Sequence, residues 1–151
     1  MSGKINNIAS NKKAWFDYEI LDRYEAGVVL VGTEVKAIRQ GMINLKDSFA
    51  KIIQNELWLV NTHISEYKFG NIHNHEPTRS RKLLLHRKEL NKLFATIREK
   101  GLTLVPLKVY LKDGRVKIEI GLCKGKKLYD KRETARKKEQ ELEIKRLTKK
   151  Y

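Results

Sequence analysis

The feature that most constrains the fold is the dipeptide Asp113-Gly114, which lies between two runs of alternating apolar and polar residues. Both residues tolerate the positive φ angles of a two-residue type I′ turn, so the sequence predicts a β-hairpin centred here. The turn fixes the register and makes one face of the hairpin aliphatic. The opposite face collects Lys108, Tyr110, Lys112, Arg115 and Lys117.

Other segments also predict β-structure. Aliphatic and β-branched residues favour strands at 18–21 and 26–31, and the turn 54–56 separates predicted strands at 49–53 and 57–60. The polar stretch 68–82 is expected to be a long loop, and a short apolar run, 83–85, follows it.

Two helices interrupt this pattern. Thr33 is a plausible N-cap of a short helix that runs to Gln40 and ends at Gly41. The segment 86–100 carries apolar residues at the i, i+3, i+4 and i+7 spacing of an amphipathic helix. We therefore expect a mainly β fold with inserted helices, a small antiparallel β-barrel of the oligonucleotide-binding type.

The net charge points to a polyanionic partner. The chain of 151 residues has 33 Lys and Arg against 18 Asp and Glu, a formal charge of +15. A positive potential of this size favours nucleic acid over an anionic membrane and disfavours a small-metabolite enzyme. One cysteine, Cys123, excludes an intrachain disulfide, and the apolar runs are too short to span a bilayer. We expect a cytoplasmic protein, monomeric and without membrane contact.

Composition changes near Cys123. Residues 123–151 contain twelve Lys and Arg against five Asp and Glu, a net charge of +7, which leaves +8 for residues 1–122. Few large apolar residues lie in this stretch, so burial does not offset the entropy of ordering it. We expect residues 1–122 to form the barrel, and residues 123–151 to be a basic tail, disordered when free and helical on an anionic surface.

No catalytic or metal-binding constellation emerges. The basic face of the hairpin fits RNA, with Tyr110 as a base-stacking candidate, although a solvated strand face is the plainer alternative. A metal site from His73, His75 and either His63 or Glu76 lacks a defining spacing. We expect no cofactor. The rival hypothesis is a small RNA-processing enzyme that uses His63, His73, His75 or His86, and a third is a structural ribosomal protein.

Two tryptophans are ambiguous from sequence. Trp15-Phe16, close to Lys12 and Lys13, is either a stacking platform or a core anchor of the first strand. Trp58 occupies an alternating strand position, so we expect it in the core.

Ordered motifs along the chain resemble the bacterial SsrA-binding protein family, small protein B (SmpB), from about Asn11 to Arg132. These motifs are Asn11-Lys12-Lys13-Ala14, Tyr24-Glu25-Ala26-Gly27, Gly32-Thr33-Glu34-Val35-Lys36, Asn44-Leu45-Lys46-Asp47-Ser48, Arg81-Lys82-Leu83-Leu84-Leu85-His86, Thr103-Leu104-Val105-Pro106-Leu107 and Gly125-Lys126-Lys127-Leu128-Tyr129-Asp130-Lys131-Arg132.

The resemblance implies a non-enzymatic factor of trans-translation. Its barrel would bind the tRNA-like domain of transfer-messenger RNA (tmRNA), and its tail would enter the vacant decoding centre of the small ribosomal subunit. Elongation factor Tu would be an indirect partner, through alanyl-tmRNA. By position, the residues expected on tmRNA are Asn11, Glu25, Leu84 and Lys117. The motifs and the basic face add Lys12, Lys13, Arg81, Lys82 and Tyr110. The residues expected in the ribosome are Lys124, Gly125, Lys126, Lys127, Tyr129, Asp130, Lys131 and Arg132.

Two positions stand out within this resemblance. Glu25 is an acid on a surface expected to face a polyanion, where it would accept hydrogen bonds from base amino groups or ribose hydroxyls, or else pair with a neighbouring Lys or Arg. Trp15-Phe16 replaces a basic Arg-His pair that is common in the family, so stacking would have to substitute for ionic contact there.

Overall fold

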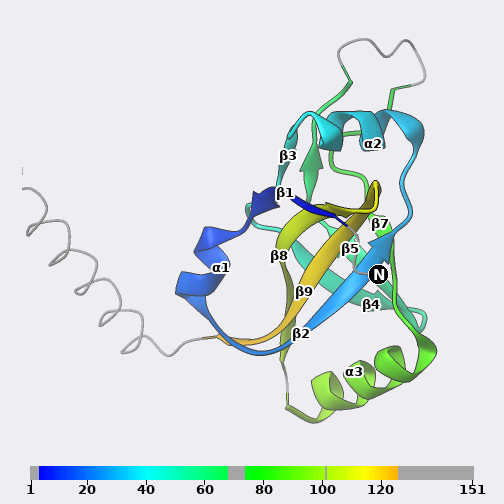
Figure 1. Ribbon diagram of the computed structural model, residues 1–151. Helices are drawn as coiled ribbons and strands as arrows, with labels where there is room; N and C mark the ends of the chain where they lie inside the picture. Colours follow the sequence, from blue (N-terminus) through cyan, green and yellow to red (C-terminus); the bar gives the residue numbers. More distant parts are fainter. Residues whose placement is uncertain (1–3, 68–73, 101, 126–151) are drawn as a thin grey trace, which may run out of the picture.

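A computed structural model describes residues 4–67, 74–100 and 102–125. Within these residues a seven-stranded antiparallel sheet has the order β1-β8-β4-β5-β7-β2-β9. An additional pairing of β8 with β9 brings the ends of the sheet together, which confirms the predicted small antiparallel β-barrel with inserted helices (Figure 1). The strands are β1 (Ile5–Ser10), β2 (Tyr18–Val28), β4 (Phe49–Ile53), β5 (Glu56–Val60), β7 (Arg81–Leu84), β8 (Thr103–Lys112) and β9 (Arg115–Gly125).

The β8–β9 hairpin has the predicted turn and register. Asp113 and Gly114 have φ angles of 52° and 79°, as a type I′ turn requires. Lys112 pairs with Arg115 and Tyr110 with Lys117, and a register shift interrupts the ladder between Pro106 and Lys108. The second predicted hairpin also forms, because Gln54 and Asn55 both adopt positive φ and join β4 to β5.

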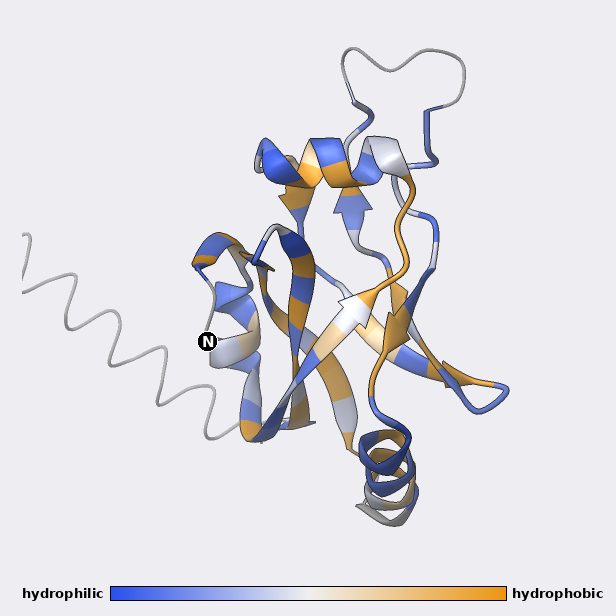
Figure 2. Cartoon of the chain, turned by 45° about the vertical axis from the view of Figure 1, so that its right-hand side comes forward, coloured by the Kyte–Doolittle hydropathy of each residue, from blue (hydrophilic) through white to orange (hydrophobic). Residues whose placement is uncertain are grey.

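In the part of the chain that the structure describes, three helices surround the barrel. They are α1 (Lys12–Asp17), α2 (Gly32–Arg39) and α3 (Arg87–Lys100), with α2 and α3 at opposite ends of the barrel (Figure 1). Leu93 of α3 is fully buried and Leu90, Phe94 and Ile97 pack on the core, as the spacing predicts. The mixed apolar and polar character of α3, and the hydrophilic turn between β4 and β5, are visible in Figure 2.

The sequence did not reveal every element. The strand β1 and the helix α1 were not predicted, and a two-stranded sheet of β3 (Ile43–Asn44) and β6 (His63–Ile64) was missed as well. The two strands predicted at 18–21 and 26–31 are one strand, β2, with a register shift between Ile20 and Asp22. This irregularity breaks the alternation on which the prediction rested.

The start of α2 also differs from the prediction. The N-cap is Val31 rather than Thr33, and Glu34 accepts a hydrogen bond from the Val31 backbone N–H at 2.9 Å. Glu34 is fully buried and paired with two arginines, so it is fixed where it caps the helix. The Thr33 hydroxyl instead lies 2.9 Å from Nδ1 of His75.

The last described strand runs past residue 122, the last residue of the predicted body. The strand β9 continues to Gly125, three residues beyond the expected boundary at 122, and Cys123 within it is fully buried. Burial raises the pKa of the Cys123 thiol to about 11, which keeps it protonated at neutral pH. Residues 123–125 are therefore part of the sheet.

Candidate nucleic-acid interface

The outer face of β2, β9 and β8 carries most of the charged residues that the hairpin prediction brought together. Cross-strand register places Glu25 opposite Glu119 and Gly27 opposite Lys117. Lys117 in turn lies opposite Tyr110. We call this surface the basic face. Its members are Arg23, Glu25 and Gly27 on β2, Lys117 and Glu119 on β9, and Lys108, Tyr110 and Lys112 on β8.

Glu25 is held by two donors from β8. The Tyr110 hydroxyl donates to Oε2 of Glu25 at 2.6 Å, and Lys112 Nζ lies 3.3 Å from Oε1. The hydrogen bond from Tyr110, with the cations Lys112 and Lys117, lowers the pKa of Glu25 below its ordinary value. The Glu25 side chain is 39% exposed, so a fixed and ionised acceptor faces solvent within a cationic surface.

Tyr110 cannot serve as a base-stacking platform. The residue is only 5% exposed, and burial together with the bond to Glu25 raises the pKa of its hydroxyl. The stacking interpretation is therefore wrong: the ring is packed into the sheet and the hydroxyl orients Glu25. The internal pairing of Glu25, which the sequence left as an alternative, is present, and 39% of the Glu25 side chain stays exposed.

The second acid of the basic face is neutralised by two other cations. Glu119 Oε2 lies 3.3 Å from Lys108 Nζ, and Oε1 lies 3.7 Å from Arg23. Arg23 also stacks on Trp15, with its guanidinium carbon 4.8 Å from the ring centroid. Alternating charges across three strands thus limit repulsion between the two opposed glutamates.

An open hollow lies beside Glu25. It has a volume of about 320 Å³. Three of the residues that the family resemblance assigns to RNA, Glu25, Leu84 and Lys117, line it from three different strands. Leu84 is 49% exposed although it is apolar. We call this feature the Glu25 hollow, and its lining is Glu25, Gly27, Leu84, Leu85, His86, Glu89 and Lys117.

Asn11, the fourth of these residues, lies elsewhere and is engaged in the fold. Its side-chain amide donates to the Pro106 carbonyl at 3.0 Å, and its side-chain oxygen accepts from the Ala14 N–H at 3.2 Å. Asn11 therefore caps α1 and ties it to β8. The neighbouring Lys12 and Lys13 are exposed.

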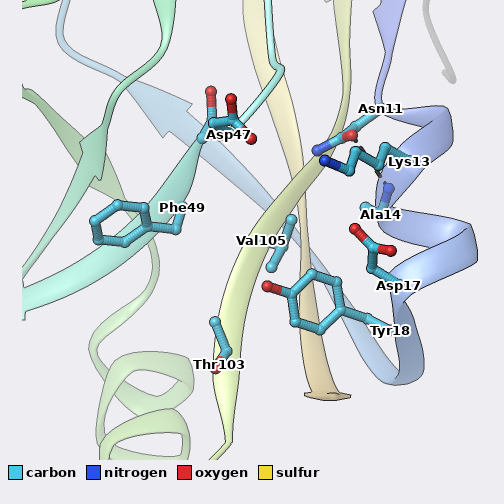
Figure 3. Close-up of a pocket in the computed structure, with 10 residues that line it drawn as sticks. Asn11, Lys13, Ala14, Asp17, Tyr18, Asp47, Phe49, Thr103 and Val105 are labelled. Carbon is cyan, nitrogen blue, oxygen red and sulfur yellow. Dashed lines mark hydrogen bonds between the residues drawn. The ribbon is translucent and has the colours of Figure 1, made fainter. Parts of the chain in front are cut away.

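A second hollow lies between α1, β8 and the start of β4. Figure 3 shows Asn11 and Lys13 on one side, Asp47 and Phe49 on the other, and Val105 between them. Its lining brings one lysine together with two aspartates, Asp17 and Asp47. It is therefore less suited to phosphate than the basic face.

Arg81 was expected on RNA, and the structure contradicts this. Its side chain is fully buried, paired with Glu34, and donates to the Thr62 carbonyl at 2.7 Å. Arg79 also pairs with Glu34. Burial would raise the pKa of Glu34, but hydrogen bonds from Arg79, the Val31 N–H and Arg81 more than compensate and lower it. Arg81 is a structural residue because no part of it is exposed.

Lys82 and Trp58 lie on the outside of the barrel. Lys82 pairs with Glu56, with 3.2 Å between Nζ and Oε1, and keeps 39% of its side chain exposed. Trp58 is half-buried between the cross-strand partners Lys51 and Lys82, whereas Leu57 and Leu59 point into the core. The expectation that Trp58 lies in the core is therefore wrong. Successive side chains of a strand point to opposite faces, and Trp58 lies on the face opposite Leu57 and Leu59.

The candidate acid–base histidines do not come together in the described residues. His63 is exposed on β6, His75 is buried with Nε2 donating to the Ile64 carbonyl at 2.8 Å, and His86 lines the Glu25 hollow. His73 lies outside the described residues. Among the residues described, no three His, Cys, Asp or Glu side chains are grouped to hold a metal ion.

The predicted tail residues divide at the end of β9. Lys124 and Gly125 are exposed in the last strand, whereas Lys126, Lys127, Tyr129, Asp130, Lys131 and Arg132 lie outside the described residues. No helix in the described part of the chain is long and apolar enough to cross a membrane.

Comparison with known proteins gives consistent matches along most of the chain. A model of the SmpB protein family matches residues 8–150. The SsrA-binding protein of Carboxydothermus hydrogenoformans is 61% identical over 137 residues, which cover 91% of this chain and 92% of that protein. The SsrA-binding protein of Ligilactobacillus salivarius is 54% identical over 148 residues, 98% of this chain and 96% of that protein. A solved structure described as "tmRNA-SmpB: a journey to the center of the bacterial ribosome" has a TM-score of 0.69 at 46% identity, and covers 86% of this chain and 95% of that one.

Proposed function

Because the chain belongs to the SmpB protein family, we propose that it is the tmRNA-binding factor of trans-translation, which delivers tmRNA to stalled ribosomes. The observation that carries this function is the Glu25 hollow. Glu25, Leu84 and Lys117 are far apart in sequence, and three strands bring them to one exposed site. A rigid barrel with such a site suits a folded RNA, because RNA shape is recognised through phosphate, ribose and unstacked bases.

The basic face supplies the electrostatic part of this recognition. Cations such as Lys117 neutralise phosphate and release counterions, which makes binding salt-dependent. Glu25 contributes little repulsion, since Lys112 lies 3.3 Å from its carboxylate. Within this proposal the exposed Lys12 and Lys13 provide a second cationic contact at the start of α1.

The residues after Gly125 carry the second half of the proposed activity. The motif from Lys126 to Arg132 and the cationic stretch behind it would enter the decoding centre only where message is absent, because bound mRNA excludes them sterically. Occupancy of the channel would thereby be sensed without reading a sequence. The protein would act through binding alone and not through turnover.

Truncation after Gly125 tests this division. The shortened chain keeps every residue of β9 and is expected to bind the tRNA-like domain of tmRNA with unchanged affinity and salt dependence. It is expected to lose ribosome rescue, measured as tagging of a peptide on a message without a stop codon. Equal loss of both activities would contradict the two-part proposal.

The enzyme alternative has its own test. Purified full-length protein, supplied with divalent metal and tmRNA, is expected to leave the RNA intact. Cleavage or modification that disappears in His86→Ala, the one described histidine in the Glu25 hollow, would favour the enzyme instead. A structural ribosomal protein would be present on all ribosomes, whereas a rescue factor is enriched on stalled ones.

A further inference from the structure

The backbone conformation at Gly27 does not require a glycine. It lies one residue before the end of β2, paired with Leu84 on one side and Lys117 on the other, and its φ is outside the left-handed region. A Cβ built there would meet Leu84 at 3.5 Å and Lys117 Nζ at 3.8 Å, which are ordinary contacts. Glycine costs strand stability, so its use here indicates the close approach of another group.

The missing side chain opens the floor of the Glu25 hollow. Gly27 and Glu25 are two residues apart on β2 and therefore share a face of the sheet. Leu84 forms an apolar wall on one side, and the Lys117 ammonium lies on the other. A flat group with one apolar face can lie over Gly27, with its edge toward the Glu25 carboxylate and a negative charge near Lys117.

The ionised carboxylate of Glu25 determines which hydrogen-bonding groups the edge of the bound ring must carry. Tyr110 and Lys112 hold its two oxygens in place, and the carboxylate has no proton to give at neutral pH. It therefore binds only donors. Among nucleobases, guanine alone presents two adjacent donors, N1–H and N2–H, that match the two oxygens of a carboxylate. Adenine and cytosine present one amino group beside a ring acceptor, which the carboxylate repels.

We propose that the Glu25 hollow holds one unpaired guanine of the bound RNA, with its ring over Gly27 against Leu84, its N1–H and N2–H donating to Glu25, and its phosphate near Lys117. This deepens the proposed function and rests on it. Tyr110 is the positioning residue, because its buried hydroxyl fixes the acceptor and never reaches the RNA.

Modification interference with kethoxal tests the proposal directly, since kethoxal adds across N1 and N2 of unpaired guanines. The tRNA-like domain of tmRNA is sparsely modified, mixed with the full-length protein, and separated into bound and unbound fractions. The expected result is one guanine whose modification is absent from the fraction bound by wild-type protein. In Glu25→Gln this exclusion is lost, and binding of the unmodified RNA weakens about tenfold, as for one bidentate base contact.

A matched control exists on the same sheet. Glu56 on β5 has a similarly exposed side chain, 45%, and belongs neither to the basic face nor to the lining of the Glu25 hollow, so Glu56→Gln is expected to keep the wild-type exclusion. Tyr110→Phe removes one hydroxyl and is expected to weaken both binding and exclusion. If Tyr110 acts only by positioning Glu25, the double variant with Tyr110→Phe and Glu25→Gln binds RNA as weakly as Glu25→Gln alone. If Tyr110 has a separate structural role, the double variant binds more weakly than Glu25→Gln.

Filling the hollow gives an independent readout. Gly27→Val projects methyl groups into it without backbone strain and is expected to weaken RNA binding at least tenfold with an unchanged unfolding midpoint. Gly27→Ala, whose Cβ makes only ordinary contacts, covers the case in which valine disturbs folding and should weaken binding to a smaller extent.

The possible outcomes separate the inference from the proposed function. Tight binding by wild type with no excluded guanine, or with an exclusion that persists in Glu25→Gln, overturns the inference and leaves tmRNA binding standing. Exclusion of adenines or cytosines probed with dimethyl sulfate, in place of a guanine, also overturns it. Absence of binding to the unmodified RNA would overturn the proposed function itself.

Discussion

Two glutamates in this barrel each have two side-chain donors, and their surroundings give them opposite roles. Glu34 is fully buried and paired with Arg79 and Arg81, at the junction between α2 and the segment before β7. Glu25 is 39% exposed, and its donors are Tyr110 and Lys112. Glu34 has no exposed side-chain surface to offer a ligand, whereas the side chain of Glu25 stays partly exposed. Burial, and not charge pairing, therefore separates the residues that build the fold from those that can bind RNA.

The largest effect is expected at the buried pair. Arg81→Met leaves Glu34 ionised and only partly compensated inside the protein, at a cost of about 3–5 kcal/mol in the free energy of unfolding. Urea denaturation monitored by circular dichroism measures it. The control is Lys82→Met, the adjacent residue on β7, whose ion pair with Glu56 is exposed and whose loss is expected to cost less than about 1 kcal/mol. If Arg81→Met and Lys82→Met lower the free energy of unfolding by similar amounts, burial does not determine how much each ion pair contributes to stability.

A smaller effect, on binding alone, is expected at the exposed site. Lys117→Gln should weaken binding of the tRNA-like domain and reduce the slope of log K against log salt by about 0.7–0.9, as expected for one lost phosphate contact. Its unfolding free energy should stay within about 0.5 kcal/mol of wild type. Lys51→Gln, an exposed lysine on β4 outside the hollow, serves as the control. An unchanged slope in Lys117→Gln would exclude Lys117 as a phosphate contact.

A modest effect is expected where the basic face meets α1. Trp15→Leu removes the ring on which Arg23 stacks, and this exposed cation–π contact contributes about 0.5–1 kcal/mol to stability. Thermal unfolding measures this loss, with Arg23→Gln as the matched change on the other partner. If Trp15 also stacks on RNA in place of the ionic contact common in the family, Trp15→Leu weakens tmRNA binding more than Arg23→Gln does.

The smallest expected effect is the change in the stability contribution of Glu25 at low pH. Because the pKa of Glu25 is lowered in the folded protein, its bonds stabilise the fold above the ordinary glutamate value and lose this contribution as pH falls through the lowered value. The stability difference between wild type and Glu25→Gln should therefore be constant near neutral pH and shrink below about pH 4.5. Denaturation at a series of pH values checks the sign, and a difference that grows in acid would contradict it.

Local signals in the sequence predicted the elements that depend on neighbouring residues. Asp113-Gly114 fixed a hairpin because two adjacent residues determine its turn and register. The amphipathic spacing in α3 was equally local. The strand β1 was missed because it is mostly exposed and polar, and it forms only by pairing with β8, about a hundred residues away.

Side-chain roles that depend on distant contacts were harder to predict. Arg81 lies within a motif that resembles RNA-binding family members, yet Glu34, 47 residues earlier in the chain, draws it into the interior. Tyr110 lies on the basic face by alternation, but its contact with Glu25 spans 85 residues. One signal was available: Gly27 sits in a strand-like run beside Glu25, where a glycine without a turn indicates a close approach.

The most direct test of the contrast between the two acids is the affinity of Glu25→Gln for the tRNA-like domain of tmRNA, measured at fixed salt beside its free energy of unfolding. We expect binding about tenfold weaker than wild type and an unfolding free energy within about 0.5 kcal/mol of it at neutral pH. Wild-type affinity in this variant, or a loss of affinity fully explained by unfolding, would show that Glu25 serves the fold as Glu34 does.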